Sequence, residues 1–130
     1  MIKPLAKQDK NNLITGKILI VDDNKSNCEM IERQLQREGH KTMTCFDGVE
    51  AMNELNKSDY DTVLLDVLMP RKNGYEVLME MKQSFKLKDI PVIMISGFKE
   101  EDTIVRCIEA GVDEYLTKPI NSTLLKAKIY

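Results

Sequence analysis

Three short apolar runs, separated by helical patterns, constrain the fold of this chain more than any other feature of its sequence. The runs are KILIV at 17–21, TVLLD at 62–66 and PVIMIS at 91–96. Continuous runs of β-branched residues and leucine are typical of parallel strands that are buried on both faces. The chain is therefore predicted to form a sheet whose two faces are both covered, as in an α/β fold.

Weaker patterns fill the spaces between and after these runs. In chain order they predict a helix at 26–39, a strand at 41–45, a helix from the N-cap Asp47, a helix at 75–84, a helix at 99–110, a strand at 113–117 and a last helix from Asn121 or Ser122. The order strand then helix thus repeats five times. Such a repeat predicts a doubly wound parallel sheet with helices on both faces.

The domain organisation follows from where this pattern begins and ends. Residues 1–16 are polar and aperiodic, so a tail or linker is expected there, followed by one domain at 17–130. A chain of 130 residues is long enough to bury the core of one domain. The last helix is short and is expected to be truncated, as in a domain excised from a longer protein; a stand-alone domain is the alternative.

Charge and composition argue against several classes of protein. The formal net charge of −2 gives no basis for direct binding to nucleic acid or anionic lipid. No apolar run approaches the roughly 20 residues that span a bilayer, and the start lacks an apolar signal core, so a cytoplasmic location is expected. Three widely spaced cysteines and one histidine argue against a zinc site or disulfides and favour buried thiols.

Polar residues follow the expected strands at the points where these strands end. Asp22 and Asp23 follow the first strand, Asp66 ends the third, Ser96 ends the fourth and Lys118 follows the fifth. In doubly wound sheets, ligands bind beyond the carboxyl ends of the strands, near the position where strand order reverses. These five side chains are therefore expected to meet at one edge of the sheet.

The chemistry of this set favours phosphoryl transfer. Clustered carboxylates raise one another's pKa unless a cation is present, and oxygen ligands favour a hard ion such as Mg²⁺. A lysine and a serine hydroxyl would complement the oxygens of a transferring phosphoryl group. One of the carboxylates can then be the nucleophile, which gives an aspartyl phosphate. No glycine-rich P-loop is present, so the phosphoryl group is expected to end on the protein.

From about Lys17 to its end, the chain resembles the CheY-like receiver domain of two-component response regulators. The resemblance rests on four motifs in order: DD after the first strand, LLDVLMPRKNGYE around the third, ISG after the fourth and YLTKP around the fifth. It implies a flavodoxin-like (βα)5 sandwich with strand order 2-1-3-4-5. It also implies Mg²⁺-dependent transfer of a phosphoryl group from a sensor histidine kinase or a histidine phosphotransfer protein.

The resemblance assigns the metal and acceptor roles. Asp66 is implied to be the phosphoacceptor. Asp22, Asp23 and Asp66, together with the backbone carbonyl of Leu68, are implied to hold Mg²⁺, for which Mn²⁺ can substitute. The domain would catalyse its own phosphorylation and dephosphorylation as a signalling phosphoacceptor, and is not expected to be an enzyme acting on a separate substrate.

The resemblance also assigns a switch. Lys118 would meet the phosphoryl group, Ser96 would be the switch hydroxyl and Tyr115 the switch aromatic, with a cis bond between Lys118 and Pro119. As Ser96 moves toward the phosphoryl group, Tyr115 would turn inward. This would repack the surface of the fourth helix, the fifth strand and the last helix. An effector domain in the same or another chain is the expected partner, and the resemblance also implies a phosphorylation-dependent homodimer.

Two positions predict slow dephosphorylation. Leu68 and Phe98 lie two residues beyond Asp66 and Ser96, where the family's side chains flank the path of the hydrolytic water. Neither can orient a water molecule by hydrogen bonding, so autodephosphorylation is expected to be slow. Gly97 is small enough to leave the phosphoryl group accessible.

Two other functions remain as alternatives. A haloacid-dehalogenase-type phosphatase also opens with a strand that ends in aspartates, but it needs Asp-x-Asp, and here the second position after Asp22 is Asn24. The chain also lacks room for the cap of such an enzyme. A receiver-like interaction module that takes no phosphate is the second alternative, against which the complete set of acidic residues, serine and lysine argues.

Overall fold

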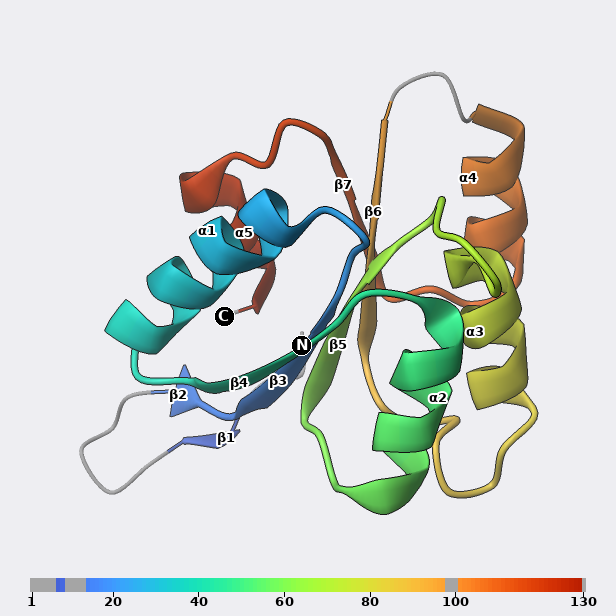
Figure 1. Ribbon diagram of the computed structural model, residues 1–130, viewed down its shortest axis with the longest axis horizontal. Helices are drawn as coiled ribbons and strands as arrows, with labels where there is room; N and C mark the ends of the chain where they lie inside the picture. Colours follow the sequence, from blue (N-terminus) through green and yellow to red (C-terminus); the bar gives the residue numbers. More distant parts are fainter. Residues whose placement is uncertain (1–6, 9–13, 98–100, 130) are drawn as a thin grey trace.

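The central sheet has five parallel strands (Figure 1). They are β3 (Lys17–Val21), β4 (Lys41–Cys45), β5 (Thr62–Asp66), β6 (Val92–Ser96) and β7 (Glu114–Thr117). This computed structural model describes residues 7–8, 14–97 and 101–129. The strands lie in the order β4-β3-β5-β6-β7, which is 2-1-3-4-5 in the order of the chain. The predicted doubly wound, flavodoxin-like fold is confirmed.

Helices cover both faces of the sheet (Figure 1). One face carries α1 (Lys25–Arg37) and α5 (Ser122–Ile129), and the other carries α2 (Gly48–Lys57), α3 (Gly74–Lys82) and α4 (Glu101–Glu109). Helices α1, α3 and α4 begin and end within two residues of the predicted bounds, and α2 begins directly after its predicted cap Asp47. In the described part of the chain, none of them is both long enough and apolar enough to cross a bilayer.

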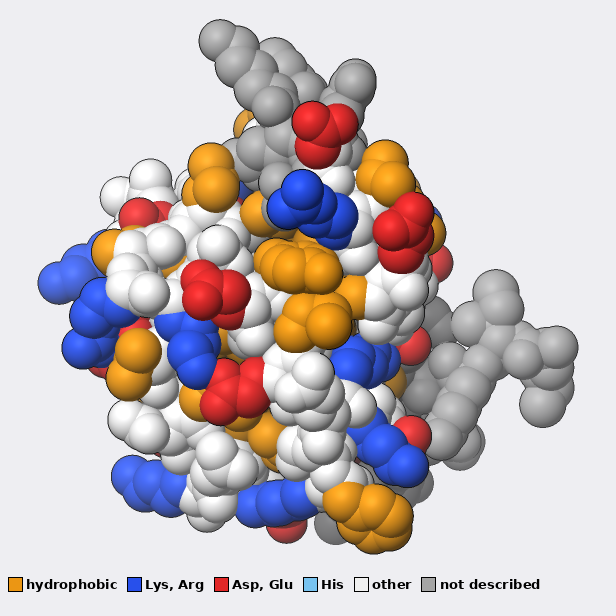
Figure 2. Space-filling view, turned by 90° about the vertical axis from the view of Figure 1, so that its right-hand side faces the viewer, with side chains coloured by type: hydrophobic (Ala, Val, Ile, Leu, Met, Phe, Trp, Pro, Cys, Tyr) orange, Lys and Arg blue, Asp and Glu red, His pale blue; other side chains and the backbone are white. Residues whose placement is uncertain are grey.

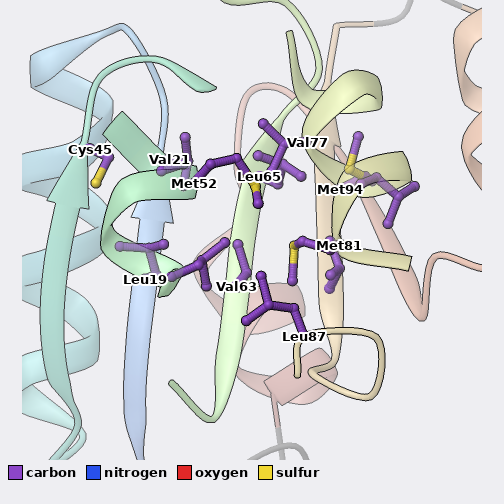
Figure 3. Packing of buried hydrophobic residues seen from close by; sticks show 14 of the residues in the cluster. Leu19, Val21, Cys45, Met52, Val63, Leu65, Val77, Met81, Leu87 and Met94 are labelled. Atoms are coloured by element: carbon purple, nitrogen blue, oxygen red, sulfur yellow. The ribbon is translucent and has the colours of Figure 1, made fainter. Parts of the chain in front are cut away.

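Two hydrophobic cores lie on the opposite faces of the sheet. Leu19 and Val21 belong to the core under α2 and α3, whereas Ile18 and Ile20 belong to the core under α1 and α5. Successive side chains of a strand point to opposite faces, so a strand buried on both faces needs an unbroken apolar run. Figure 3 shows the first core, where Met81 of α3 packs beside the strands. The KILIV run is explained by this double burial.

The segment before β3 contains a short antiparallel pair, β1 (Lys7–Gln8) and β2 (Ile14–Thr15). After it, the Gly16 N–H donates to His40 Nδ1 at 3.1 Å, and the Gly16 carbonyl accepts from the Lys41 N–H at 2.9 Å. The chain is thus hydrogen-bonded to the α1–β4 connection just before β3 begins. That residues 1–16 act as a tail or linker stays a prediction.

The polar residues at helix starts explain where several helices begin. Asn24 caps α1 by accepting from the Asn27 N–H, and Asp47 caps α2 by accepting from the Glu50 N–H, as predicted for Asp47. Asn121 accepts from the Leu124 N–H at the start of α5. These caps place the helix N-termini directly after the carboxyl ends of the strands, where the polar residues gather. The three cysteines are buried and free, as the sequence predicted.

Candidate functional site

The carboxyl ends of β3 and β5 bring three carboxylates together. The parallel register pairs Val21 with Leu65, so Asp22 and Asp66, the next residues of each strand, reach the same edge of the sheet. Asp22 and Asp66 are buried, whereas Asp23 is exposed. Each of the three offers a carboxylate oxygen, and these oxygens lie within 4.8 Å of one another.

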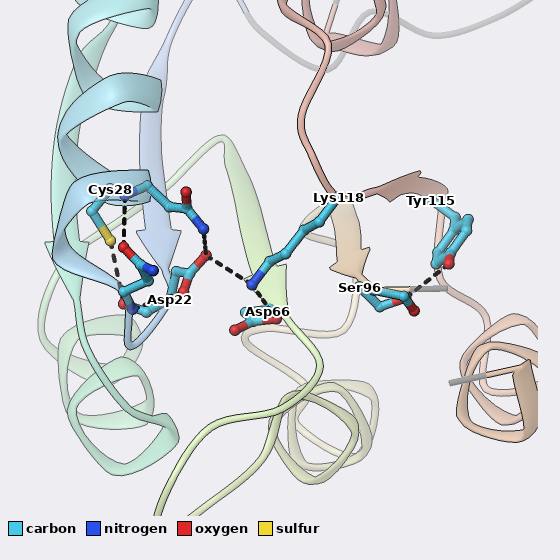
Figure 4. Close-up of polar contacts among 9 residues, drawn as sticks. Asp22, Cys28, Asp66, Ser96, Tyr115 and Lys118 are labelled. Carbon is cyan, nitrogen blue, oxygen red and sulfur yellow. Dashed lines mark hydrogen bonds and ion pairs between the residues drawn. The ribbon is translucent and has the colours of Figure 1, made fainter. Parts of the chain in front are cut away.

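Lys118 reaches the same cluster from the end of β7 (Figure 4). The backbone N–H of Lys118 donates to the Ser96 carbonyl at 2.8 Å and continues the pairing of β6 with β7. The Lys118–Pro119 peptide bond is cis. The ammonium Nζ lies 3.4 Å from Asp22 Oδ2 and 3.2 Å from Asp66 Oδ1. One side chain thus bridges the two buried carboxylates.

The charges of this cluster are not balanced. Burial, and then the negative charge of Asp22, raise the pKa of Asp66 to about 7, although Lys118 acts in the opposite direction. Burial lowers the pKa of Lys118, but the charges of Asp66 and Asp22 outweigh burial and raise it, so the lysine stays charged. Lys118 supplies one positive charge to three carboxylates. A hard divalent cation with oxygen ligands fits this donor set.

Asp22 is fixed by the first turn of α1. The Asn24 N–H donates to Asp22 Oδ1 at 2.9 Å, and the Asn27 amide lies 3.5 Å from Oδ2. The Cys28 thiol donates to the Asp22 carbonyl at 3.3 Å (Figure 4), and burial together with the charge of Asp22 raises the pKa of Cys28 to about 12. The thiol therefore stays protonated and acts as a structural donor. The contacts that Asn24, Asn27 and Cys28 make with Asp22 were not predicted, although the sequence shows these three residues at and just before the start of the predicted helix.

The predicted switch residues lie next to one another on β6 and β7 (Figure 4). The hydroxyls of Ser96 and Tyr115 are 2.8 Å apart, and Ser96 Oγ also donates to the Gly97 carbonyl at 3.3 Å. Ser96 is fully buried. The two hydroxyls are thus already paired in this structure, whereas the sequence-based hypothesis had Tyr115 turn inward only after Ser96 moved. Their role as a switch stays a prediction.

The loop between β5 and α3 carries the predicted carbonyl ligand. The Gly74 N–H donates to the Val67 carbonyl at 2.8 Å, and a Cβ on Gly74 would lie 2.1 Å from the Asp66 carbonyl oxygen. Only glycine permits this close approach. Leu68 lies within the loop with 58% of its surface exposed, and its metal-binding role stays a prediction. Phe98, the other position linked to slow hydrolysis, lies outside the described residues.

This arrangement brings together the groups that the inferred chemistry requires. Asp66, the predicted nucleophile, has a buried carboxylate, and Lys118 holds a positive charge beside it. The Ser96 hydroxyl lies at the end of the neighbouring strand β6 and contacts the Tyr115 hydroxyl on β7. Fixed charges placed where an anionic group develops charge are the main source of catalysis in phosphoryl transfer.

Comparison with known protein families agrees with this geometry. The family model described as the response regulator receiver domain matches residues 18–130. A transcriptional regulatory protein of Haemophilus influenzae, a CpxR homolog, is 40% identical over 114 residues, which cover 88% of this chain and 48% of that protein. The chain thus spans about half the length of this curated relative.

Solved structures of similar fold include receiver domains of histidine kinases. The signal receiver domain of a signal transduction histidine kinase from Syntrophus aciditrophicus has a TM-score of 0.82 and 32% identity, and the match covers 88% of this chain and 86% of that one. The receiver domain of sensor histidine kinase PA1611 from Pseudomonas aeruginosa has a TM-score of 0.81 and 27% identity, with 88% and 94% covered. That structure has a magnesium ion coordinated in the active-site cleft.

Proposed function

Because this chain belongs to the family of response regulator receiver domains, we propose that it is a phosphoacceptor in which Asp66 receives the phosphoryl group. The observation that carries the proposal is the position of Lys118, whose Nζ lies between the buried carboxylates of Asp22 and Asp66. This arrangement places a positive charge where a phosphoryl group on Asp66 would develop its negative charge.

The same carboxylates are suited to hold a divalent ion. We propose that Asp22, Asp23 and Asp66, with the Leu68 carbonyl, hold Mg²⁺, and that Mn²⁺ can substitute for it. The oxygen cluster, its excess of negative charge and the magnesium in the PA1611 receiver domain support this assignment. When bound, the ion would supply positive charge that offsets the charge on the phosphoryl oxygens.

Asp66 is proposed to attack the phosphorus of a phosphohistidine, on a sensor histidine kinase or a phosphotransfer protein, or of a small phosphodonor. An O–P bond forms on Asp66 while the P–N bond to the donor histidine breaks, so the domain catalyses its own modification. Lys118 Nζ, which already contacts Asp66 Oδ1, would then donate to a phosphoryl oxygen.

Ser96 would transmit the change to the surface. Its hydroxyl, which donates to the Gly97 carbonyl, would donate to a phosphoryl oxygen instead, because the dianion is the stronger acceptor, and this movement would break its contact with the Tyr115 hydroxyl. Release of Tyr115 would change the packing at α4, β7 and α5. Phosphorylation can favour the active form only through contacts that differ between the two forms.

Figure 2 looks onto the side formed by α3 and α4, where hydrophobic side chains lie exposed among charged ones. Val105 and Ile108 of α4 are exposed.

The length of the Haemophilus influenzae regulator suggests an effector domain as a partner. The matched regulator is about twice as long as the aligned region, so we propose an effector domain in the same or another chain. Residues 17–130 would be the receiver domain, and residues 1–16 a tail or linker. Homodimerisation on phosphorylation and a cytoplasmic location are part of the same proposal.

The test is phosphorylation by a small donor. The chain is incubated with acetyl phosphate and Mg²⁺, and bound phosphate is measured by intact mass, then mapped by borohydride reduction of the acyl phosphate. We expect one phosphate on Asp66 and none in the Asp66→Ala variant. If the wild type gains no modification that Asp66→Ala abolishes, the chain is an interaction module. Turnover on simple phosphate esters would instead indicate a phosphatase.

We also predict that phospho-Asp66 hydrolyses slowly, because the apolar Leu68 and Phe98 side chains offer no hydrogen bond to an attacking water. The Leu68→Asn, Phe98→Glu variant should hydrolyse faster by on the order of tenfold, since a positioned polar group assists proton transfer. Phosphate release after removal of the donor measures this rate. A wild-type lifetime of seconds, or equal rates in the two proteins, would contradict the prediction.

A further inference from the structure

The loop between β5 and α3, residues 67–73, contains a residue with an unusual backbone conformation. Arg71 has a backbone φ of +65°, which residues other than glycine rarely adopt. The Lys72 N–H donates to the Pro70 carbonyl at 2.8 Å and closes a three-residue turn around Arg71. Turns of this type with a positive φ at their centre are strained. Other contacts must therefore stabilise the loop in this conformation.

One such contact joins Arg71 to Asp47 at the start of α2. Arg71 Nε and Nη2 donate to Asp47 Oδ2 at 3.0 and 2.6 Å. The Asp47 side chain is only 12% exposed, although that of Arg71 is 58% exposed. The other oxygen, Asp47 Oδ1, accepts from the Glu50 N–H at 2.9 Å. A single carboxylate thus both caps α2 and holds the loop.

The charge of Asp47 favours this double role. Burial by itself raises the pKa of Asp47, but the hydrogen bonds from the Glu50 N–H and Arg71, and the charge of Arg71, outweigh burial and hold the pKa below its usual value. The carboxylate is therefore ionised at neutral pH and makes charge-assisted hydrogen bonds to the guanidinium, which are stronger than neutral ones.

The backbones of α2 and the loop also touch. The Gly48 N–H donates to the Lys72 carbonyl at 3.1 Å, and a Cβ on Gly48 would lie 2.2 Å from that oxygen. At the other end, Gly74 folds back onto the Asp66 backbone. The loop is thus held at α2 on one side and at Asp66 on the other, with Leu68 between these two anchors.

We propose that the Asp47–Arg71 pair is a clamp that positions the phosphoryl-transfer site, an inference that rests on the function proposed above. By holding loop 67–73 against α2, the pair keeps Asp66 and the Leu68 carbonyl in the arrangement that a divalent cation requires. Ligand sites need their groups held within about 0.5 Å of the productive geometry. Loss of residues that orient ligands typically lowers metal affinity by about 10- to 100-fold. Both partners act as positioning residues, because neither belongs to the predicted ligand set.

Three variants separate the clamp from its surroundings. Asp47→Asn keeps a cap on α2, because asparagine caps helices as well as aspartate, but removes the charge that faces Arg71. Arg71→Gly removes the side chain and relieves the positive φ. Arg71→Lys keeps the charge without the fork of two donors. Lys72→Gln is the matched control. It changes the neighbouring residue of the same loop and removes the ion pair between Lys72 and Glu80 of α3, but leaves the Asp47–Arg71 pair unchanged.

The experiment measures Mg²⁺ affinity of the full chain by calorimetry, with no phosphodonor present, together with exchange of the Gly48 amide hydrogen. We expect Asp47→Asn and Arg71→Gly each to weaken Mg²⁺ binding by about tenfold and to speed amide exchange. Arg71→Lys should recover part of the affinity, and Lys72→Gln should match the wild type. The double variant Asp47→Asn, Arg71→Gly should bind no more weakly than either single variant, as expected for one shared interaction.

The outcomes distinguish the clamp from the proposed function. Wild-type Mg²⁺ affinity in both Asp47→Asn and Arg71→Gly overturns the clamp alone. A loss of affinity in Asp47→Asn but not in Arg71→Gly also overturns it, because the carboxylate would then act only through α2. A wild type that binds no Mg²⁺ overturns the proposed function, and the clamp's role with it.

Discussion

Replacing Asp22 and Asp23 together with asparagine is expected to abolish Mg²⁺-dependent phosphorylation while leaving the apo domain folded and more stable than the wild type. The two carboxylates contribute two of the three acidic oxygens in the cluster. Without them, the ion that offsets charge on the phosphoryl group would lose most of its ligands. Because such charge stabilisation contributes several kcal/mol, the rate should fall by at least about a hundredfold.

The gain in stability follows from the charge balance. In the wild type, Lys118 faces both Asp22 and Asp66, and the charge of Asp22 helps raise the pKa of Asp66. With Asp22 neutral, Lys118 and Asp66 form a balanced pair. The asparagine oxygen can still accept from the Asn24 N–H, which now bonds Asp22 Oδ1. Relief of this repulsion is therefore expected to raise the free energy of unfolding of the apo domain.

Two measurements test this prediction. Phosphate incorporation from acetyl phosphate reports the chemistry, and urea unfolding in the presence of a chelator reports the stability of the apo domain. Asp59→Asn, Asp89→Asn is a matched control, since it removes two exposed carboxylates from connections that precede β5 and β6, at the opposite ends of these strands. Normal phosphorylation of the Asp22→Asn, Asp23→Asn protein would refute the metal-binding role of both residues, and strong destabilisation would contradict the argument from repulsion.

The contribution of Asp66 to the stability of the apo domain is expected to decline as pH rises from about 4 to about 7. The pKa of Asp66 in the folded protein is raised to about 7 from its ordinary value of 3.8. Between these values the folded state keeps a proton that the unfolded state has released, so the unfolded state gains stability relative to the folded one as pH increases. The contribution is fully present below about pH 4 and is lost through about pH 7, on the order of 4 kcal/mol in all.

Comparison with Asp66→Asn isolates this contribution from that of other groups. A protonated carboxyl resembles the neutral amide, so the two proteins should have similar unfolding free energies near about pH 4, whereas the variant should be more stable at about pH 8. Urea unfolding of both proteins across this range, with a chelator present, measures the difference. A constant difference across the range would show that the pKa of Asp66 is not raised.

The same proton competes with Mg²⁺. Asp66 must lose its proton before it can act as a metal ligand or nucleophile, so Mg²⁺ affinity should fall by about tenfold for each pH unit below about 7. Calorimetric titration at several pH values measures this slope, with Asp66→Asn as the control that should lack it. A wild-type affinity that does not change with pH would mean that Asp66 is already ionised throughout.

The strands and the acidic edge of the sheet could be predicted because both depend on local patterns. The run from Ile18 to Val21 is apolar throughout because each of its faces contacts a separate core. Once the strands are placed, the parallel arrangement alone puts Asp22 and Asp66 at a common edge. The order of the strands came from the resemblance to a family, because the periodicity of a strand does not specify its neighbour.

The contacts that tie the site together depended on tertiary structure. Arg71 and Asp47 are 24 residues apart, and nothing in their spacing indicates that one carboxylate would cap α2 and also hold the β5–α3 loop. The pairing of Ser96 with Tyr115 likewise depends on how two neighbouring strands align. The periodicity of a strand predicts which of its side chains are buried, and a cap residue predicts where a helix begins. The path of a loop is decided by which distant donors and acceptors it can satisfy after the sheet and helices have packed.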